Sequence, residues 1–165
     1  PCGLMRRYAD TDLAQLPDAR VATIACPFSG DSLTAVAALN PDVTILHAQQ
    51  VDAAGNVLIH GIVGAMKEAA MAARSLIVTV EERVERLNSD MNSVVLPAWL
   101  VTAVSVVPGG AYPSYAQGYY PRDNRFYLAW DEIARDRETF LQWMQRYVLA
   151  LPDHAAFLRA LQVAA

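Results

Sequence analysis

The feature that most constrains the fold is a hairpin pattern in residues 43–61. VTILHAQ and VLIHG, at the two ends of this segment, are rich in the β-branched and apolar residues that are typical of strands. The AAGN stretch between them predicts the turn, because Gly55 or Asn56 can adopt a positive φ. The segment therefore predicts two neighbouring strands.

A helix and another strand follow the hairpin. AMKEAAMAAR (residues 65–74) is rich in alanine and contains no helix breaker. LIVTV (residues 76–80) is a short apolar run that ends on Glu81 and Glu82. A strand, a helix and a strand within about 30 residues are typical of a βαβ unit. The sequence therefore predicts an α/β fold, with a mixed, partly parallel sheet and flanking helices, in a single domain over residues 1–165.

Further elements are predicted on either side of this core. Residues 20–26 and 104–107 predict strands, and residues 4–16 predict a modest helix. The chain after residue 124 is helical in pattern, and Asp153 is the expected N-cap of a terminal helix. One helical face has the spacing i, i+3, i+4, i+7 and consists of Phe140, Trp143, Met144 and Tyr147.

The composition is apolar for a chain of 165 residues. Hydrophobic residues make up 54% and charged residues 18%, with a mean hydropathy of +0.18. Two explanations are open: a partner covers much of the surface, or several strands are buried on both faces. We expect self-association or a partner, and therefore an oligomer.

Charge and targeting signals exclude some classes of protein. A net charge of −4 and a pI near 5.3 argue against a nucleic-acid partner, which needs a basic surface. No apolar run reaches the roughly 18 residues that suggest a membrane span. Nothing in this sequence suggests secretion, and Cys2 and Cys26 fit a reducing cytoplasm, although a disulfide between them is possible. The chain begins with Pro1, which we interpret as part of a longer protein.

Two histidines could form a metal or catalytic pair. His47 and His60 flank the predicted hairpin and could face each other across it. A zinc site needs more ligands, and Asp52 lies near the turn and not opposite them. We therefore expect structural roles for both histidines and no metal.

Two glutamates end the strand at residues 76–80. Ligands of open α/β sheets bind outside the carboxyl ends of parallel strands. Because adjacent side chains on a strand point to opposite faces, only one of Glu81 and Glu82 can face a cleft. Two interpretations stay open: they line a site, or they pair with Arg83, Arg86 or a neighbouring loop.

The loop PGGAYPSYAQGYYP (residues 108–121) is the least ordinary part of the sequence. The N–H groups of Gly109 and Gly110 could bind a carbonyl oxygen or a phosphate. Its tyrosines could line a pocket or an interface. Phosphate-loop, dinucleotide and GxSxG motifs are absent, and Cys26 has no histidine nearby in sequence. The sequence assigns no catalytic residue to this chain.

Three segments in order resemble the family I coenzyme A (CoA) transferases, in particular the A (alpha) subunits of the glutaconate CoA-transferase-like group. They are HAQQVDAAGNVLIHG, LIVTVEERV and VVPGGAYPSYAQGYYPRDNRFY. The resemblance covers nearly the whole chain and corresponds to the carboxy-terminal part of such a protein. It implies the fold of the NagB/RpiA/CoA-transferase group, with a helical carboxy terminus.

The resemblance also implies a function. Family enzymes pair an A with a B subunit to move CoA between a CoA thioester and a carboxylic acid, through a glutamyl-CoA intermediate on the B subunit. CoA thioester is then a substrate, and no tightly bound cofactor is expected. The residues expected to bind substrate are Glu82, Gly109, Gly110, Tyr112, Gln117 and Tyr119. Tyr112 stands where many relatives have histidine, and His60 where they often have tryptophan.

Two alternatives stay open beside the transferase. Some relatives are hydrolases that open rings of CoA thioesters and lack the glutamate of the B subunit. The second alternative is that the chain is a non-catalytic structural subunit. We expect this chain alone to be inactive. A sugar-phosphate isomerase of related fold fits the residues less well.

Overall fold

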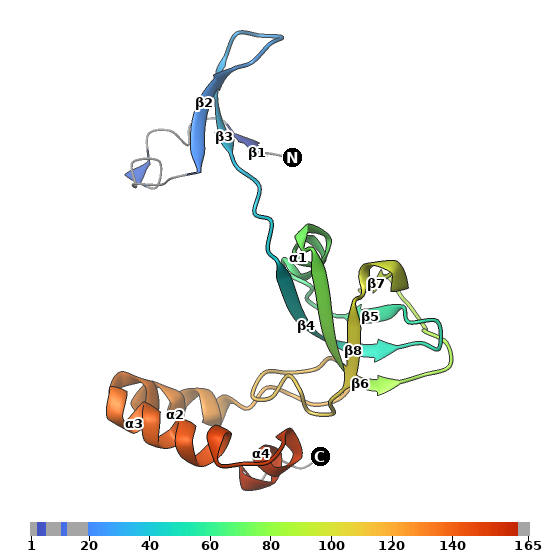
Figure 1. The fold of residues 1–165 in the computed structure, drawn as a ribbon, viewed down its shortest axis with the longest axis vertical. Helices are drawn as coiled ribbons and strands as arrows, with labels where there is room; N and C mark the ends of the chain where they lie inside the picture. Colours follow the sequence, from blue (N-terminus) through green and yellow to red (C-terminus); the bar gives the residue numbers. More distant parts are fainter. Residues whose placement is uncertain (1–2, 6–10, 13–19, 162–165) are drawn as a thin grey trace. The chain divides into compact units, whose positions relative to one another are not determined.

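The computed structural model describes residues 3–5, 11–12 and 20–161 (Figure 1). The chain divides into two compact units, Pro1–Asn40 and Pro41–Ala165. The single domain that the sequence suggests stays a prediction.

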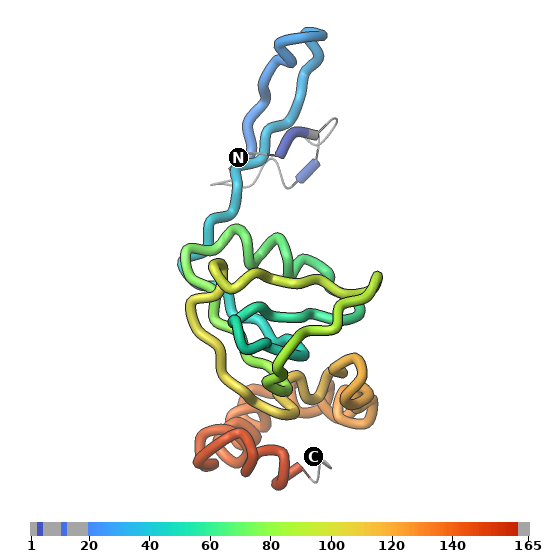
Figure 2. Tube along the Cα trace, turned by 90° about the vertical axis from the view of Figure 1, so that its right-hand side faces the viewer, coloured from blue at the N-terminus to red at the C-terminus, as the bar shows by residue number. Residues whose placement is uncertain are grey.

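The first unit contains a three-stranded antiparallel sheet, in the order β1-β3-β2. Its strands are β1 (Gly3–Met5), β2 (Val21–Ala25) and β3 (Ser32–Val36). Figure 2 draws the β2–β3 hairpin as two neighbouring runs of blue tube. The strand predicted at residues 20–26 is confirmed. The helix predicted at residues 4–16 is wrong at Leu4 and Met5, because pairing with β3 overrides their local preference; most of its other residues lie outside the described ones.

The second unit is built on a five-stranded mixed sheet, in the order β7-β5-β4-β6-β8. β4, β6 and β8 are parallel, whereas β5 pairs antiparallel with both β4 and β7. The strands are β4 (Val43–Val51), β5 (Val57–His60), β6 (Ser75–Arg83), β7 (Ser93–Leu96) and β8 (Ala103–Val106). The mixed α/β fold is therefore confirmed, as are the strands predicted at the two ends of residues 43–61, at residues 76–80 and at residues 104–107. Between β7 and β8, Pro97 begins a short 3₁₀ helix, η2 (Ala98–Leu100).

The turn of the β4–β5 hairpin is held by its polar residues. Gly55 has a φ of +90°, as the sequence predicts. Asp52 Oδ1 accepts hydrogen bonds from Ala54 N (3.0 Å) and Asn56 N (2.8 Å). Asn56 Oδ1 in turn accepts from Ala98 N at 3.0 Å, at the start of η2. These residues therefore serve the architecture of the turn.

One face of this sheet is buried and the other is open within the unit. Helix α1 (Met66–Ala72) covers the buried face, where Thr44 Oγ1 donates to Ala69 O at 3.0 Å. The buried core on this face includes Leu46, Ala48, Leu76, Val78 and Val80. On the other face Ile45 is 70% exposed and Ile77 38%. Because parallel strands are normally buried on both faces, a covering layer explains the apolar composition better than burial within the unit.

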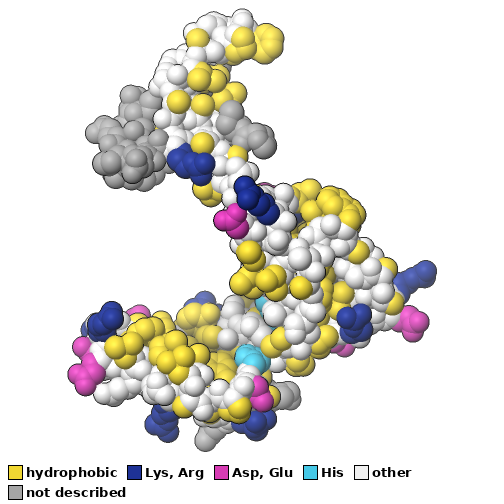
Figure 3. Space-filling model, viewed as in Figure 1, with side chains coloured by type: hydrophobic (Ala, Val, Ile, Leu, Met, Phe, Trp, Pro, Cys, Tyr) yellow, Lys and Arg dark blue, Asp and Glu magenta, His cyan; other side chains and the backbone are white. Residues whose placement is uncertain are grey.

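The carboxy-terminal region is helical, as predicted. Its elements are α2 (Asn124–Arg135), α3 (Arg137–Met144), the π-helix η3 (Gln145–Leu149) and α4 (His154–Ala160). Asp123, Asp136 and Asp153 cap the three α-helices, which confirms the N-cap predicted at Asp153. The predicted apolar face is half-buried, and its Trp143 lies edge-on to Trp130 with ring centroids 4.9 Å apart. Figure 3 shows apolar side chains gathered over this helical region.

Candidate functional site

The carboxyl ends of the three parallel strands meet at one edge of the second unit. Gln50 on β4 is the neighbour of Glu82 on β6, and β8 ends beside Val80. The loop of residues 107–121 leaves β8 at this edge and leads to α2 (Figure 1). Ligands of open α/β sheets bind in the crevice at this place. The site is therefore built from strand ends and from this loop.

Glu81 is the buried centre of this edge, with 5% of its surface exposed. Its Oε1 accepts hydrogen bonds from His47 Nε2 (2.7 Å) and from the Tyr120 hydroxyl (2.5 Å), and its Oε2 accepts from Gly109 N (2.7 Å). Burial and the bond to Glu81 raise the pKa of Tyr120, whose hydroxyl also accepts from Ala111 N. Three donors offset the cost of burying the carboxylate. Glu81 therefore ties the loop to the end of β6.

Two glycines allow the loop to approach this centre closely. A Cβ on Gly110 would lie 2.6 Å from His47 Cε1, and one on Gly109 would lie 2.6 Å from Leu158 Cδ1 on α4. Gly110 N donates to Val107 O at 3.0 Å, and Gly109 N donates to the buried carboxylate. Both N–H groups therefore have acceptors within the chain, so in this arrangement neither is left to bind an oxyanion. The assignment of the two glycines as substrate-binding residues stays a prediction.

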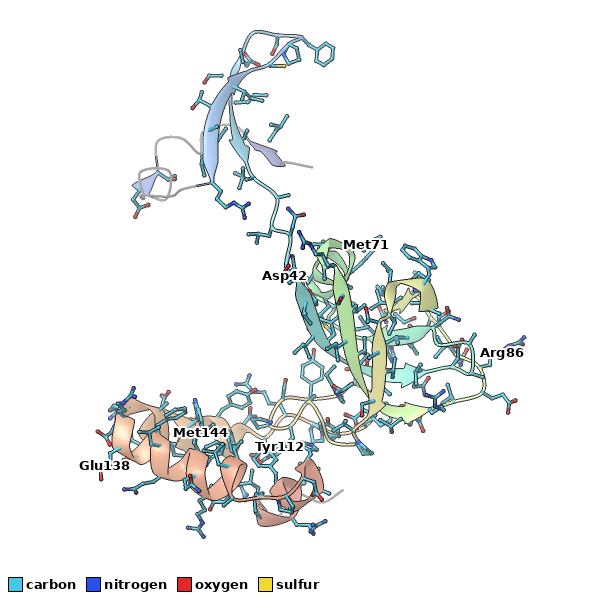
Figure 4. All side chains as sticks on the ribbon, viewed as in Figure 1. Asp42, Met71, Arg86, Tyr112, Glu138 and Met144 are labelled. Atoms are coloured by element: carbon cyan, nitrogen blue, oxygen red, sulfur yellow. The ribbon has the colours of Figure 1, made fainter. Side chains whose placement is uncertain are left out.

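Glu82 lies on the opposite face of β6 and is exposed. Its Oε1 accepts from the Tyr119 hydroxyl (2.6 Å) and from Gln50 Nε2 (2.8 Å). The hydrogen bond from Tyr119, and then that from Gln50, lower the pKa of Glu82. Burial and the hydrogen bond to Glu82 raise the pKa of Tyr119 to about 12. In the described part of the chain Arg83 and Arg86 pair with neither glutamate, and Arg86 extends away from the sheet (Figure 4).

A cleft of about 380 Å³ opens beside Glu82, and we name it the Glu82 cleft. Its lining residues are Gln49, Gln50, Leu58, His60, Glu82, Asn88, Gln117, Gly118 and Tyr119. Three residues expected to bind substrate, Glu82, Gln117 and Tyr119, therefore lie together. The volume is within the range of small-molecule sites.

Tyr112 is directed away from this cleft, toward the carboxy-terminal helices (Figure 4). Its hydroxyl donates to Asp123 Oδ2 at 2.7 Å, and its ring lies edge-on to Phe126 and Phe157. Burial and the bond to Asp123 raise the pKa of Tyr112 well above its usual value. Tyr112 does not line the Glu82 cleft. Its expected role in substrate binding stays a prediction.

The two histidines do not face each other. His47 Nδ1 lies 2.8 Å from Thr79 Oγ1, and its Nε2 donates to the buried glutamate. His60 Nε2 instead lies 3.3 Å from Asp90 Oδ2. The possible pairing of His47 with His60 is therefore wrong: the hairpin pairs residues 50 and 51 with residues 58 and 57, and this register does not bring the two histidines opposite each other. Among the described residues, no group of three or more His, Cys, Asp or Glu could hold a metal ion.

Sequence reasoning did not identify Gln50 and Asn88 as part of the cleft. Gln50 lies opposite Glu82 in the parallel register of β4 and β6, so its polar type at a strand end was the signal. Asn88 lies in the connection after β6, and nothing in the local sequence distinguishes it from other polar loop residues.

Comparison with known proteins defines the class of this chain. The family model described as coenzyme A transferase matches residues 16–106. The chain belongs to this family.

No helix within the described residues is long and apolar enough to cross a membrane.

Individual relatives are more specific. The chain is 54% identical to the A subunit of 3-oxoadipate CoA-transferase from Pseudomonas knackmussii, over 95% of this chain and 55% of that protein. It is 35% identical to the A subunit of glutaconate CoA-transferase from Acidaminococcus fermentans, over 90% of this chain and 48% of that protein. The chain therefore spans about half the length of these relatives.

Solved structures agree with this fold. The crystal structure of glutaconate CoA-transferase from Acidaminococcus fermentans superposes with a TM-score of 0.77 and 34% identity, covering 88% of this chain and 47% of that one. A variant of the decarboxylase AibA/AibB gives a TM-score of 0.61 and 29% identity, covering 86% of this chain and 47% of that one. The same fold therefore occurs in structures described as a transferase and as a decarboxylase.

Proposed function

We propose that this chain is the carboxy-terminal part of the A subunit of a CoA-transferase, which works with a B subunit. The observation that carries this proposal is the 54% identity to the A subunit of a 3-oxoadipate CoA-transferase over 95% of the chain. The decarboxylase is a more distant neighbour, at 29% identity. CoA thioester is a substrate, and the location is the cytoplasm.

The reaction runs through a glutamate of the B subunit. That carboxylate attacks the thioester carbonyl, forming an acyl anhydride and releasing the CoA thiolate, which then attacks the glutamyl carbonyl and releases the first acid. A second carboxylic acid takes the CoA away by the reverse steps. The hydrogen bonds of Glu81 support a B-subunit nucleophile, because both oxygens of this buried carboxylate already accept bonds within the chain.

This chain contributes a wall of the site in this proposal. The Glu82 cleft lies at the carboxyl ends of parallel strands, and its polar lining can orient a substrate. The loop of residues 107–121 supplies Gln117, Gly118 and Tyr119 to that wall. The carboxylic acid is of the 3-oxoadipate type, because the relative with 54% identity carries that name.

The test is to assemble the full-length protein with its B partner and to incubate it with a CoA donor and 3-oxoadipate. We expect 3-oxoadipyl-CoA to accumulate as the donor thioester disappears, followed by mass spectrometry. The chain of 165 residues, when it is assayed without the B subunit, should show no exchange. Exchange by this chain alone would contradict the division of labour between the subunits.

Two other outcomes identify other reactions on the same scaffold. Release of free CoA thiol without any acid acceptor would identify the hydrolase, and release of CO2 from an acyl-CoA would identify a decarboxylase. An assembled enzyme that gives none of these products would support a non-catalytic role.

A further inference from the structure

The Glu82 cleft contains polar groups that the chain itself leaves uncommitted. Glu82 Oε1 accepts two hydrogen bonds, whereas Oε2 forms none within the described residues. The side-chain amides of Asn88 and Gln117 also form none there, although both line the cleft. The side-chain amide of Gln49, in contrast, accepts a hydrogen bond from His60 N at 2.9 Å and donates one to His60 O at 3.2 Å. One carboxylate oxygen and two amides are thus free for a ligand.

The charge of the residues that line the cleft disfavours anionic ligands. Among the described residues that line it, none is Lys or Arg, and Glu82 carries a negative charge. His60 Nε2 lies 3.3 Å from Asp90 Oδ2, so a second carboxylate stands beside the cleft. A phosphate group or a second carboxylate would meet an uncompensated like charge, which is unfavourable near a protein surface. A neutral ligand with hydrogen-bond donors meets no such cost.

We propose that the Glu82 cleft receives the pantetheine arm of the CoA thioester, with Glu82 Oε2 accepting a hydrogen bond from one of its N–H or O–H groups. This inference rests on the proposed function. The arm is uncharged and carries two amides and a hydroxyl, which match one carboxylate acceptor and the amides of Asn88 and Gln117. The nucleotide phosphates and the carboxylic acid substrate then bind outside this cleft, where cationic groups can meet them.

The experiment uses the assembled enzyme of both subunits and two donors, the CoA thioester and the corresponding pantetheine thioester, which lacks the nucleotide. In Glu82→Gln, the KM for both donors should rise by about tenfold, since a hydrogen bond to a charged acceptor is weakened. The KM for the carboxylic acid should stay within about twofold, because that substrate binds outside the cleft. Glu138→Gln, the same change on α3 far in sequence from the cleft, should leave all three KM values unchanged.

A second variant separates binding by Glu82 from positioning of the loop. Tyr119→Phe removes one of the two bonds to Glu82 and keeps its charge. If Glu82 binds the arm, this variant raises the thioester KM much less than Glu82→Gln does. Equal increases in the two variants would overturn the inference, because Glu82 would then act only by anchoring Tyr119.

Other outcomes are equally decisive. A change in the KM for the acid alone would place the acid in the cleft, and dissociation of the two subunits in Glu82→Gln would show that a side chain of the partner occupies it. Either result would overturn the inference. The proposed function would still stand, because the wild-type enzyme would still exchange CoA. A wild-type assembly without exchange activity would instead contradict the proposed function.

A binding measurement provides the test should Glu82→Gln fail to fold. The wild-type assembly is titrated with pantetheine in a calorimeter, with and without CoA. We expect pantetheine to bind and CoA to compete with it, because both place the same arm in the Glu82 cleft. Absence of pantetheine binding would overturn the inference.

Discussion

Glu81 and Glu82 are adjacent residues of the same type, but the structure places them in opposite environments. Glu81 is buried and accepts three hydrogen bonds from three parts of the chain. Glu82 is exposed, and both of its bonds reach the same oxygen. Adjacent tyrosines mirror the pair, since Tyr120 binds Glu81 and Tyr119 binds Glu82. The alternation of a strand therefore separates the structural role of Glu81 from the binding role that we propose for Glu82.

The largest expected difference between the two glutamates is in stability. Glu81→Gln replaces one acceptor oxygen by an amide that faces a buried donor, and should lower the free energy of unfolding by roughly 2–3 kcal/mol. Glu82→Gln should change it by less than about 0.5 kcal/mol, as for most exposed sites. Urea unfolding followed by tryptophan fluorescence measures both. Equal losses in the two variants would show that Glu81 and Glu82 do not differ in structural importance.

The close approach of the loop to His47 predicts the next effect. Gly110→Ala places a Cβ against the His47 ring, so the ring or the loop must move, at a cost of about 1–3 kcal/mol. Gly3→Ala is the control, because a Cβ at that position meets no atom of the described residues within 4 Å. The same unfolding measurement applies. An undiminished stability of Gly110→Ala would show that the contact is not essential.

The two tyrosines should differ in the same direction as the glutamates that they bind. Tyr120→Phe removes one donor from the buried carboxylate and should cost about 1–1.5 kcal/mol of unfolding free energy. Tyr119→Phe removes a donor from an exposed carboxylate and should cost less than about 0.5 kcal/mol. Differential scanning calorimetry of the two variants tests this order, and a larger loss for Tyr119→Phe would reverse it.

The smallest expected effect is a shift in titration. The Tyr119 hydroxyl is the first cause of the lowered pKa of Glu82, so Tyr119→Phe should raise this pKa toward its usual value. Because the folded-state pKa is depressed, the contribution of Glu82 to stability is present above about pH 4.3 and is lost as the pH falls through the folded-state pKa. Carbon NMR of the carboxyl group measures the shift, and an unchanged pKa would contradict the hydrogen bond.

Tyr119 contributes at the alkaline end with the opposite sign. Its pKa is raised to about 12, so its contribution is full below about pH 10 and is lost as the pH rises toward 12. Absorbance of the phenolate at high pH, compared between the wild type and Tyr119→Phe, should show this group ionising late. Ionisation near the usual tyrosine pKa of about 10 would contradict it.

Local sequence predicted the sheet well because its signals are local. The turn at Gly55, the strands and the cap at Asp153 depend on nearby residues, and the structure confirms them. Alternation along a strand also predicted that only one glutamate faces a cleft. The N–H of Gly109 donates to Glu81, which is distant in sequence, and the N–H of Gly110 donates to Val107 O within the loop, so the sequence pattern alone did not show that both N–H groups have acceptors.

Long-range contacts explain the other differences. Leu4 and Met5 form a strand because they pair with β3, which lies far from them in sequence. Tyr112 is directed to the helices because Asp123 accepts its hydrogen bond. Asn88 joins the cleft only through the path of a loop. None of these contacts can be predicted from the spacing of residues in the sequence alone.

The most direct test of the account is to locate the covalent intermediate. The assembled enzyme of both subunits is incubated with a CoA thioester, trapped, digested and mapped by mass spectrometry. We predict a glutamyl-CoA adduct on a peptide of the B subunit, with none on the peptide that contains Glu81 and Glu82. An adduct on either of these two glutamates would contradict the account, because it would make this chain the source of the nucleophile.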